Sequence, residues 1–206
     1  MPNWCNNTVS ITHEDPAKMS ALVEAMNANK FCNFAIPVPT DLSETISGSF
    51  GDGEKQAALE AQTARNVEQF GYGNWYDFCV SRWGTKWEVD TQGSVDFDNQ
   101  TVTASFDSAW SPPTGVYQAL VEDGYDVVAY YYEPGMGFLG KYDNGFDETF
   151  EISSETSKTV RSVIGAELDD MFNISESMAE YEAENEDTEE LTEWIKDGVE
   201  AKEKTE

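Results

Sequence analysis

Residues 101–133 read TVTASFDSAWSPPTGVYQALVEDGYDVVAYYYE and predict a strand, a helix and a second strand, in that order. In 101–108 every second residue is apolar from Val102 to Phe106, which is the period of a half-buried strand. Ser111 is a candidate N-cap followed by two prolines, and Gly124 is a candidate helix end. The stretch 125–133 is rich in Val and Tyr, which favours a strand. The helix residues expected to face the core are Val116, Tyr117, Leu120 and Val121.

A strand and a helix are also predicted at the start of the chain. Residues 3–12 end in an alternating pattern that places Val9 and Ile11 on one face. Asp15 followed by Pro16 is a typical helix start, with an N-cap and a proline at the first helical position. The helix is expected over 16–28, with an apolar side formed by Met19, Leu22, Val23 and Met26.

One further strand completes the predicted core. Trp87, Val89, Val95 and Phe97 are expected in a strand that turns at 98–100 and pairs with 101–108 as a hairpin. The order is then βαββαβ, which is the ferredoxin-like arrangement within the α+β class. We expect this domain over 1–152, with an insertion at about 31–86. One face of its sheet would stay partly open, to be covered by the insertion, the terminal helices or a partner.

The remaining segments of the first 152 residues are less regular. The segment 31–42 contains Ile36-Pro37-Val38-Pro39, which we expect to be extended and whose prolines exclude a central strand. Residues 54–70 look helical, and 74–90 form the aromatic centre of the chain. Four glycines in 135–145 predict a loop or a short irregular hairpin, and 146–152 a last strand.

The segment 153–206 is predicted to be an acidic α-helical extension. From 166 to 206 it carries 16 acidic and three basic residues. We expect a helix over 156–172, weak order over 175–187, and a last helix that opens at Thr188. The apolar stripe of the first helix is Val160, Val163, Ile164, Leu168, Met171 and Phe172. That of the last helix is Leu191, Trp194, Ile195 and Val199.

The charge of the chain excludes several classes of function. With 40 acidic and 12 basic residues, the formal net charge is −28. Direct binding to the phosphates of a nucleic acid, or to an anionic membrane, is therefore not expected. No segment approaches the roughly 18 apolar residues of a membrane span, and the start of the chain has no leader pattern. We expect a soluble, cytoplasmic protein.

Metal and cofactor sites are not expected either. Cys5, Cys32 and Cys79 form no CxxC pair, and His13 is the single histidine, so the residues for a zinc site are lacking. The thiols are expected to be reduced and mostly buried. The acidic clusters lack the glycine-centred spacing of a calcium-binding EF-hand loop. No cofactor and no catalytic constellation is predicted, so we do not expect an enzyme.

Six ordered motifs carry a family resemblance. They are PNWCNN at 2–7, IPVP at 36–39, WYD at 75–77, WGTKW at 83–87, FDSAWSPP at 106–113 and YEPGMGF at 132–138. Together they resemble the Api92-like family, also called the YubB ferredoxin-like family, of phages and mobile elements. The resemblance covers about residues 1–150 and implies a ferredoxin-like core and a phage, prophage or plasmid origin. It implies no activity, and the acidic segment from about 153 lies outside it.

The most distinctive candidate site is the pentapeptide Trp83-Gly84-Thr85-Lys86-Trp87. Gly84 is expected to adopt a positive φ in a tight bend. One interpretation is an aromatic pocket in which Lys86 or Arg82 binds a carboxylate or phosphate. The other is a packed corner in which Lys86 pairs with a local acid. The pocket residues would be Trp75, Arg82, Trp83, Lys86, Trp87 and Trp110.

Two functions follow from these features. The first is a phage or mobile-element protein of the host cytoplasm that mimics nucleic acid and inhibits a basic host DNA- or RNA-acting protein, such as a defence nuclease. Its acidic face would be Glu180, Glu182, Glu184, Glu186, Asp187, Glu189 and Glu190. The second is a small-molecule or peptide-binding module built on the aromatic pocket. The acids can also serve solubility alone, and the oligomeric state stays open.

Overall fold

The computed structural model of the chain describes residues 3–91, 96–98 and 101–185. The chain divides into two compact units, Met1–Thr149 and Phe150–Glu206. This division falls three residues before the domain boundary expected at 152. Each unit is described separately below.

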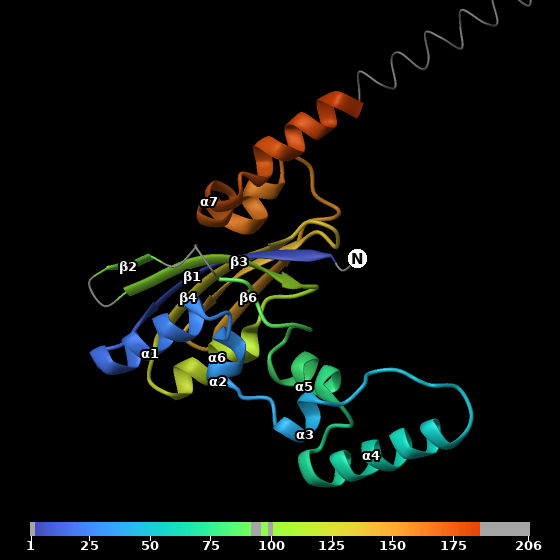
Figure 1. Cartoon of the computed structure of the whole chain (residues 1–206). Helices are drawn as coiled ribbons and strands as arrows, with labels where there is room; N and C mark the ends of the chain where they lie inside the picture. The colour runs from blue at the N-terminus through green and yellow to red at the C-terminus, as the bar shows by residue number, and fades with distance from the viewer. Residues whose placement is uncertain (1–2, 92–95, 99–100, 186–206) are drawn as a thin grey trace, which may run out of the picture. The chain divides into compact units, whose positions relative to one another are not determined.

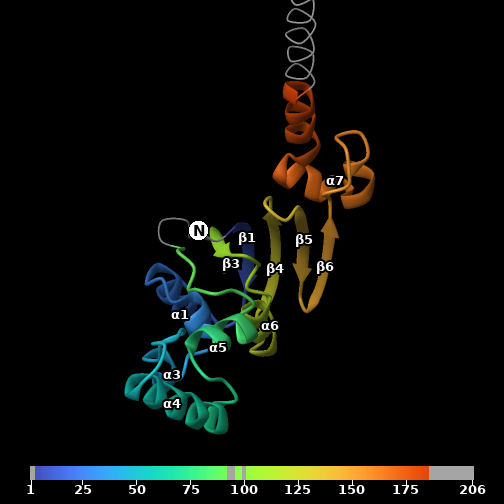
Figure 2. The ribbon, with the colours of Figure 1, turned by 90° about the vertical axis from the view of Figure 1, so that its right-hand side faces the viewer.

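The first unit is built on an antiparallel sheet with the strand order β2-β3-β1-β4-β5-β6. Figure 2 shows the strands from β3 to β6 side by side in this order. β1 is antiparallel to both β3 and β4, and β3 is antiparallel to β2. β1 and β2 are therefore parallel with β3 between them, and β3 and β4 are parallel with β1 between them. The strands are β1 (Trp4–Thr12), β2 (Asp96–Asp98), β3 (Thr101–Ala109), β4 (Asp126–Glu133), β5 (Phe138–Asp143) and β6 (Phe146–Glu151).

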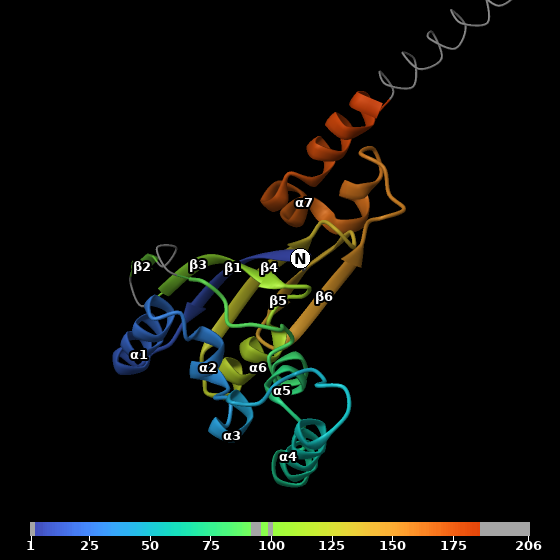
Figure 3. The same cartoon turned by 45° about the vertical axis from the view of Figure 1, so that its right-hand side comes forward.

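Three helices cover one face of this sheet. They are α1 (Pro16–Asn27), α2 (Phe31–Ala35) and α6 (Thr114–Glu122), and Figures 1 and 3 both show them on the same side of the strands. The predicted inward residues of β1 and β3 are buried against them, and so are Met19, Leu22 and Met26 of α1. The predicted α+β architecture is therefore confirmed.

The opposite face of β1 and β3 is polar. Thr8 and Ser105 share a hydrogen bond of 3.1 Å between their hydroxyl groups, and Asn6 donates to Asp107 at 2.6 Å. A sheet face of this composition is compatible with water. These residues therefore do not require another part of the chain, or a partner, to cover this face of the sheet.

The starts of the two long core helices differ in how well they were predicted. Asp15 caps α1, because its Oδ1 accepts a hydrogen bond of 2.8 Å from the amide of Ala17, as expected. Helix α6 begins at Thr114 after Pro113, without a side-chain cap. The prediction that Ser111 caps this helix was wrong, because its hydroxyl donates instead to the carbonyl oxygen of Gly84.

The insertion between α1 and β2 contains α2 and three further helices, α3 (Thr40–Ser43), α4 (Glu54–Phe70) and α5 (Trp75–Arg82). The segment 36–39, predicted to be extended, lies outside any helix or strand, but the short helices α2 and α3 on either side of it were not predicted. The amides of Cys32 and Asn33 donate to the carboxylate of Glu88, at 2.7 and 2.9 Å. This distant side chain satisfies the free amides at the start of α2, which the local sequence could not reveal.

The segment that precedes β2 also differs from the prediction. Trp87 and Val89 were expected in a strand, but residues 83–91 contain none. Side-chain bonds of Thr85 and Glu88 tie this segment to Ala109 and to α2, so its backbone does not pair with β3 there. Val95 lies outside the described residues, and β2 is only three residues long.

The glycine-rich stretch 135–145 contains the strand β5, which pairs with β4. The buried carboxylate of Glu133 accepts hydrogen bonds from the amides of Gly135 and Met136, at 2.8 and 2.6 Å, and so forms a tight turn. A Cβ on Gly140 would collide with the hydroxyl group of Tyr131. Of the two predicted alternatives, a loop or a short hairpin, the structure shows the hairpin, and Gly140 permits its close packing against β4.

The second unit contains α7 (Val160–Phe172) and a helix over 174–185. Helix α7 begins four residues later than predicted, and Gly165 breaks it with φ 80° and ψ 166°. Val160, Ile164 and Leu168 are buried as predicted, whereas Val163 and Met171 are exposed, contrary to the predicted stripe. The prediction of weak order over 175–187 was wrong for its described part, and the helix expected from Thr188 lies outside the described residues.

Asp169 explains why the second helix forms. Its carboxylate is almost fully buried and accepts hydrogen bonds from the amide and hydroxyl groups of Ser175, at 2.7 and 2.8 Å. It therefore caps the start of the helix over 174–185. Within 3–91, 96–98 and 101–185, no helix combines the length and the apolar character needed to cross a bilayer.

Candidate functional site

Two turns distant in sequence are fixed to each other by side-chain hydrogen bonds. Thr85 Oγ1 donates to the carbonyl oxygen of Ala109 at 3.0 Å, and Ser111 Oγ donates to that of Gly84. Gly84 has φ +88°, as predicted, and a Cβ there would lie 3.0 Å from the carbonyl oxygen of Pro112. The turn around 84 therefore needs glycine for both its conformation and its packing.

A series of hydrogen bonds between buried polar side chains supports these two turns. Tyr117 donates to Asn7 Oδ1 at 3.1 Å, Asn7 donates to Ser108 Oγ at 2.8 Å, and Ser108 donates to the carbonyl oxygen of Ser111 at 2.8 Å. Burial raises the pKa of Tyr117, which keeps its hydroxyl group protonated as a donor. These hydrogen bonds link β1, α6 and the turn at 108–111 into one rigid arrangement.

Trp110 occupies a strained backbone position within the second turn. Its φ is +72°, a left-handed value that is an outlier for a bulky residue. Its amide donates to the carbonyl oxygen of Asn3 at 2.9 Å, and its side chain is 40% exposed. Such strain costs on the order of 1–3 kcal/mol and concentrates at functional sites.

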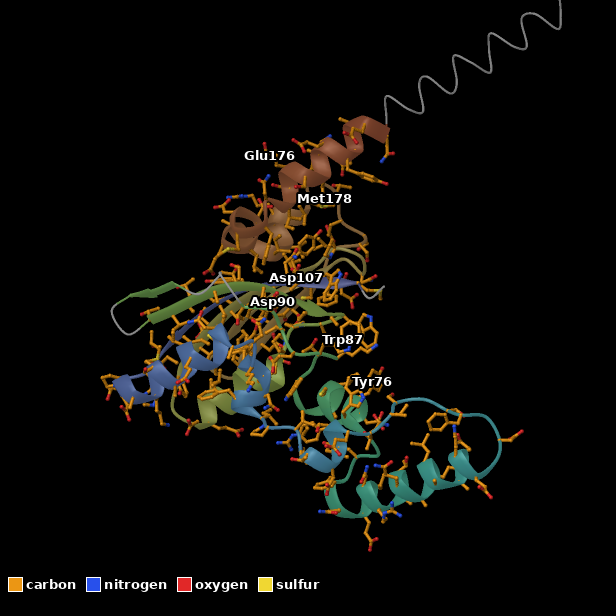
Figure 4. All side chains as sticks on the ribbon, in the orientation of Figure 1. Tyr76, Trp87, Asp90, Asp107, Glu176 and Met178 are labelled. Atoms are coloured by element: carbon orange, nitrogen blue, oxygen red, sulfur yellow. The ribbon has the colours of Figure 1, made fainter. Side chains whose placement is uncertain are left out.

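The ammonium group of Lys86 lies among three aromatic rings. Its Nζ is 4.2 Å from the ring centroid of Trp87, 5.0 Å from that of Trp110 and 5.5 Å from that of Tyr76. We call these three rings the aromatic cluster. Figure 4 shows Tyr76 on α5, next to the segment that carries Trp87. Trp4 extends the cluster, with its ring 6.3 Å from that of Trp87.

Cation–π contacts hold Lys86 in place of an ion pair. In the described part of the chain, no carboxylate oxygen lies within 4.0 Å of its Nζ. The interpretation that Lys86 pairs with a local acid is therefore not what the structure shows for these residues. Cation–π contacts within about 6 Å stabilise an ammonium group without neutralising its charge.

A cavity of about 420 Å³ lies beside the aromatic cluster. Three tryptophans form much of its wall, and Trp83 among them is almost fully buried and donates through Nε1 to the carbonyl oxygen of Ile36 at 2.8 Å. Two cations, Lys30 and Lys86, lie on its wall. Among the described residues, its lining is Lys30, Asn33, Val38, Ser43, Trp75, Cys79, Trp83, Lys86, Trp87 and Glu88.

The one carboxylate on this wall is already satisfied. Glu88 Oε1 accepts from the amides of Cys32 and Val89, and Oε2 accepts from that of Asn33, at 2.7 to 3.2 Å. Burial raises the pKa of the Cys79 thiol to about 12, so this thiol is not a nucleophile at neutral pH. The wall therefore offers apolar rings and ammonium groups to a ligand.

The structure brings most of the predicted pocket residues together. Trp75, Trp83, Lys86 and Trp87 line the cavity, and Trp110 approaches Lys86 from outside it. Arg82 does not join them, because it lines a different depression with Tyr72 and Glu122. Tyr76 and Lys30 were missed. The motif at 75–77 contained Tyr76 as a signal, whereas nothing in the sequence connects Lys30 with a segment 56 residues later.

A second and larger cavity, of about 640 Å³, lies along β1 and β3. Its wall includes Asp90 and Asp107, which Figure 4 labels. Asp107 already accepts a hydrogen bond from Asn6. Trp4 is the one tryptophan on its wall among the described residues, and a smaller share of this wall is apolar than in the cavity beside the aromatic cluster.

Only part of the predicted acidic face can be placed. Glu180 and Glu184 are exposed on the helix over 174–185. Glu182 is not free, because its carboxylate accepts hydrogen bonds from the amide and hydroxyl groups of Ser157, at 2.8 and 2.6 Å. Glu186, Asp187, Glu189 and Glu190 lie outside the described residues, and so do Leu191, Trp194, Ile195 and Val199.

Metal ligands do not gather in the part of the chain that the structure describes. No group of three or more His, Cys, Asp or Glu side chains there is arranged to hold a metal ion. The three cysteines are free and buried, as expected.

Comparison with known proteins gives one distant similarity to report. No family model and no curated protein matches the sequence. Among solved structures, the chain is similar to the protein Api92 from Yersinia pseudotuberculosis, with 11% sequence identity and a TM-score of 0.38. The match covers 75% of this chain and 99% of that one. This is a distant structural relationship, and it does not assign the chain to a family.

Proposed function

We propose that the first unit is a binding module, and that its cavity takes the flat apolar group of a small molecule or of a peptide side chain. The observation that carries this proposal is the cavity of about 420 Å³ walled by Trp75, Trp83 and Trp87. Its volume lies within the range of ligand pockets, about 300–1,000 Å³, and it combines aromatic walls with a few polar groups. Binding, not catalysis, is the proposed activity.

The rigidity of the site supports the same proposal. The hydrogen bonds between the turns at 84–85 and 109–111 hold the wall before any ligand arrives. Trp110 keeps a strained backbone there, which the surrounding bonds must maintain. A preorganised wall lowers the cost of ordering side chains when a ligand binds.

A cavity-filling variant tests the proposal. The probe is N-phenyl-1-naphthylamine, a neutral dye whose fluorescence rises in apolar sites. Ser43 is exposed on the cavity wall, and Ser20 is exposed on α1 away from it. We expect Ser43→Phe to weaken saturable binding by about tenfold or more and Ser20→Phe to leave it unchanged. Equal binding by both variants, or no saturable binding by the parent of either this dye or its anionic analogue 8-anilino-1-naphthalenesulfonate, would overturn the proposal.

We propose nucleic-acid mimicry as a second function, located in the acidic extension. It is supported by the 16 acidic residues between 166 and 206 and by the exposure of Glu180 and Glu184. A surface of this charge would attract a basic host DNA- or RNA-acting protein, such as a nuclease, at steered rates. A phage or mobile-element origin and a location in the host cytoplasm belong to this proposal.

We further propose that the chain is a distant member of the Api92-like family with a ferredoxin-like core. The strand order supports this assignment, because β1 and β2 are parallel with β3 between them, and β3 and β4 are parallel with β1 between them. Several of the family motifs also meet in the structure. WGTKW and FDSAWSPP supply the two bonded turns, and PNWCNN supplies Asn7 behind them.

A further inference from the structure

The position of Lys86 points to the charge of the ligand. Its ammonium group is bounded by the three rings of the aromatic cluster, and the same side chain lines the cavity. The rings hold the positive charge in a defined place, but their π faces are only weak acceptors for its N–H groups. The three N–H groups of Lys86 therefore keep capacity for an acceptor that enters the cavity.

The other charged groups on the cavity wall also favour an acceptor with a negative charge. Lys30 is exposed at the rim and adds a second positive charge. Glu88 would favour a cationic ligand if its carboxylate were free, but three backbone amides donate to its two oxygen atoms. An amine in the cavity would thus compete with these amides for Glu88 and would lie near two ammonium groups.

We propose that the ligand of this cavity carries an anionic group, a carboxylate, sulfonate or phosphate, which Lys86 binds while an apolar ring lies against the tryptophans. This inference rests on the proposed binding function and names its ligand class. A hydrogen bond between an ammonium group and an anion is about twice as strong as one between neutral groups. Lys86 is therefore the specificity-determining residue, and the tryptophans supply contact area.

Two dyes that share their rings separate charge from shape. The first is 8-anilino-1-naphthalenesulfonate, which is anionic, and the second is the neutral N-phenyl-1-naphthylamine. Lys86→Met keeps a long unbranched side chain among the rings but removes the charge. Lys158→Met, at an exposed position of the second unit, is the control with the same change of net charge.

We expect Lys86→Met to weaken the anionic dye by about tenfold and the neutral dye by less than about twofold. Lys158→Met should change neither. If the parent binds both dyes and Lys86→Met weakens neither, or weakens both equally, the inference is overturned while the binding function stands. If the parent binds neither dye, the binding function itself fails.

Displacement of the bound anionic dye then shows whether the anionic group of the ligand belongs to a free small acid or to an acidic peptide. Indole-3-propionate represents a free small acid, and acetyl-Trp-Glu-amide represents an acidic peptide. Displacement of the anionic dye by either compound, and its loss in Lys86→Met, supports the inference and names the source. Failure of both compounds to displace a dye that is bound in the cavity would overturn it.

Discussion

Lys86 Nζ lies 5.0 Å from the ring centroid of Trp110, although the two residues are 24 positions apart and sit in different turns. Gly84, two residues before Lys86, has φ +88°, and Trp110 itself has φ +72°. Both turns therefore use left-handed backbone to bring the ammonium group and the indole together. The cost of these conformations is met by the hydrogen bonds that join the turns.

The strain at Trp110 predicts an unusual order of stabilities. Replacing Trp110 by Gly or by Ala removes the same ring, but alanine in a left-handed conformation costs about 1–2 kcal/mol. Glycine loses about 0.4–1 kcal/mol through the greater freedom of the unfolded chain. We therefore expect Trp110→Gly to be more stable than Trp110→Ala by about 0.5–1 kcal/mol in urea unfolding.

Trp87 provides the matched control for this pair. It belongs to the same aromatic cluster but has no positive φ. There the order should reverse, with Trp87→Gly less stable than Trp87→Ala. If glycine is the less stable replacement at both positions, Trp110 is not strained.

Gly84 should tolerate a methyl group less well than another left-handed glycine does. Gly71 has φ +80° and ends α4, with no atom within 4 Å of an added Cβ. At Gly84 the Cβ would lie 3.0 Å from the carbonyl oxygen of Pro112 and 3.2 Å from the amide nitrogen of Thr114. We expect Gly84→Ala to lose about 1–3 kcal/mol more than Gly71→Ala in the free energy of unfolding. Equal losses would mean that backbone conformation alone sets the cost at 84.

The sequence predicted those parts of the fold that local patterns determine. β1, α1, β3, α6 and β4 were found because their apolar periods of 2 and 3.6 residues match the faces that they bury. Trp75, Trp83, Lys86 and Trp87, which the sequence grouped together, line one cavity because they are close in sequence, whereas Arg82 does not reach it. Local pattern and tertiary packing agree in these segments.

The errors arise where a distant side chain replaces a local signal. Glu88 stabilises the start of α2, 56 residues before it, a helix for which the local sequence gave no signal. Asp169 similarly starts the helix over 174–185, which composition alone made look weakly ordered. Lys30 reaches the cavity only through the folding of the insertion. Such contacts have no period and no fixed spacing, so a single sequence does not reveal them.

Asp169 predicts a loss of stability of the second unit in acid. Burial opposes the ionisation of its carboxylate, but hydrogen bonds from Ser175 and Arg161 outweigh that effect, so the pKa of Asp169 lies below its usual 3.8. A lowered pKa stabilises the folded state above pH 3.8, and this stability is lost as the pH falls through the folded-state pKa.

Hydrogen–deuterium exchange of the full chain can measure this effect. Between about pH 5 and pH 3, after correction for intrinsic rates, protection over 160–185 should fall more than protection in β1 and β4. Asp169→Asn should reduce the protection of 160–185 at about pH 6 and make it less dependent on pH. An unchanged pH dependence in this variant would show that other carboxylates are responsible.

The mimicry proposal predicts that charge in the extension matters more than the same charge elsewhere. The test variant changes acidic residues of the extension to Gln but spares Glu182, because Glu182 binds Ser157. Its positions are Glu180, Glu184, Glu186, Glu189 and Glu190. The control variant changes five exposed acids of the first unit, Glu14, Glu24, Glu44, Glu54 and Glu68, so that both variants have the same net charge.

The measurement is displacement of a labelled DNA duplex from purified basic DNA-binding proteins and nucleases. An exposed ion pair is worth about 0.2–1 kcal/mol, so five of them together change affinity by roughly fivefold to a few thousandfold. We expect the variant in the extension to lose inhibition by this factor, and the control to lose much less. Added salt should weaken the parent's inhibition steeply, because exposed charges are screened within about 10 Å at 0.1 M. Equal losses in both variants would show that inhibition depends on net charge alone. Undiminished inhibition by the extension variant would exclude this segment as the binding surface.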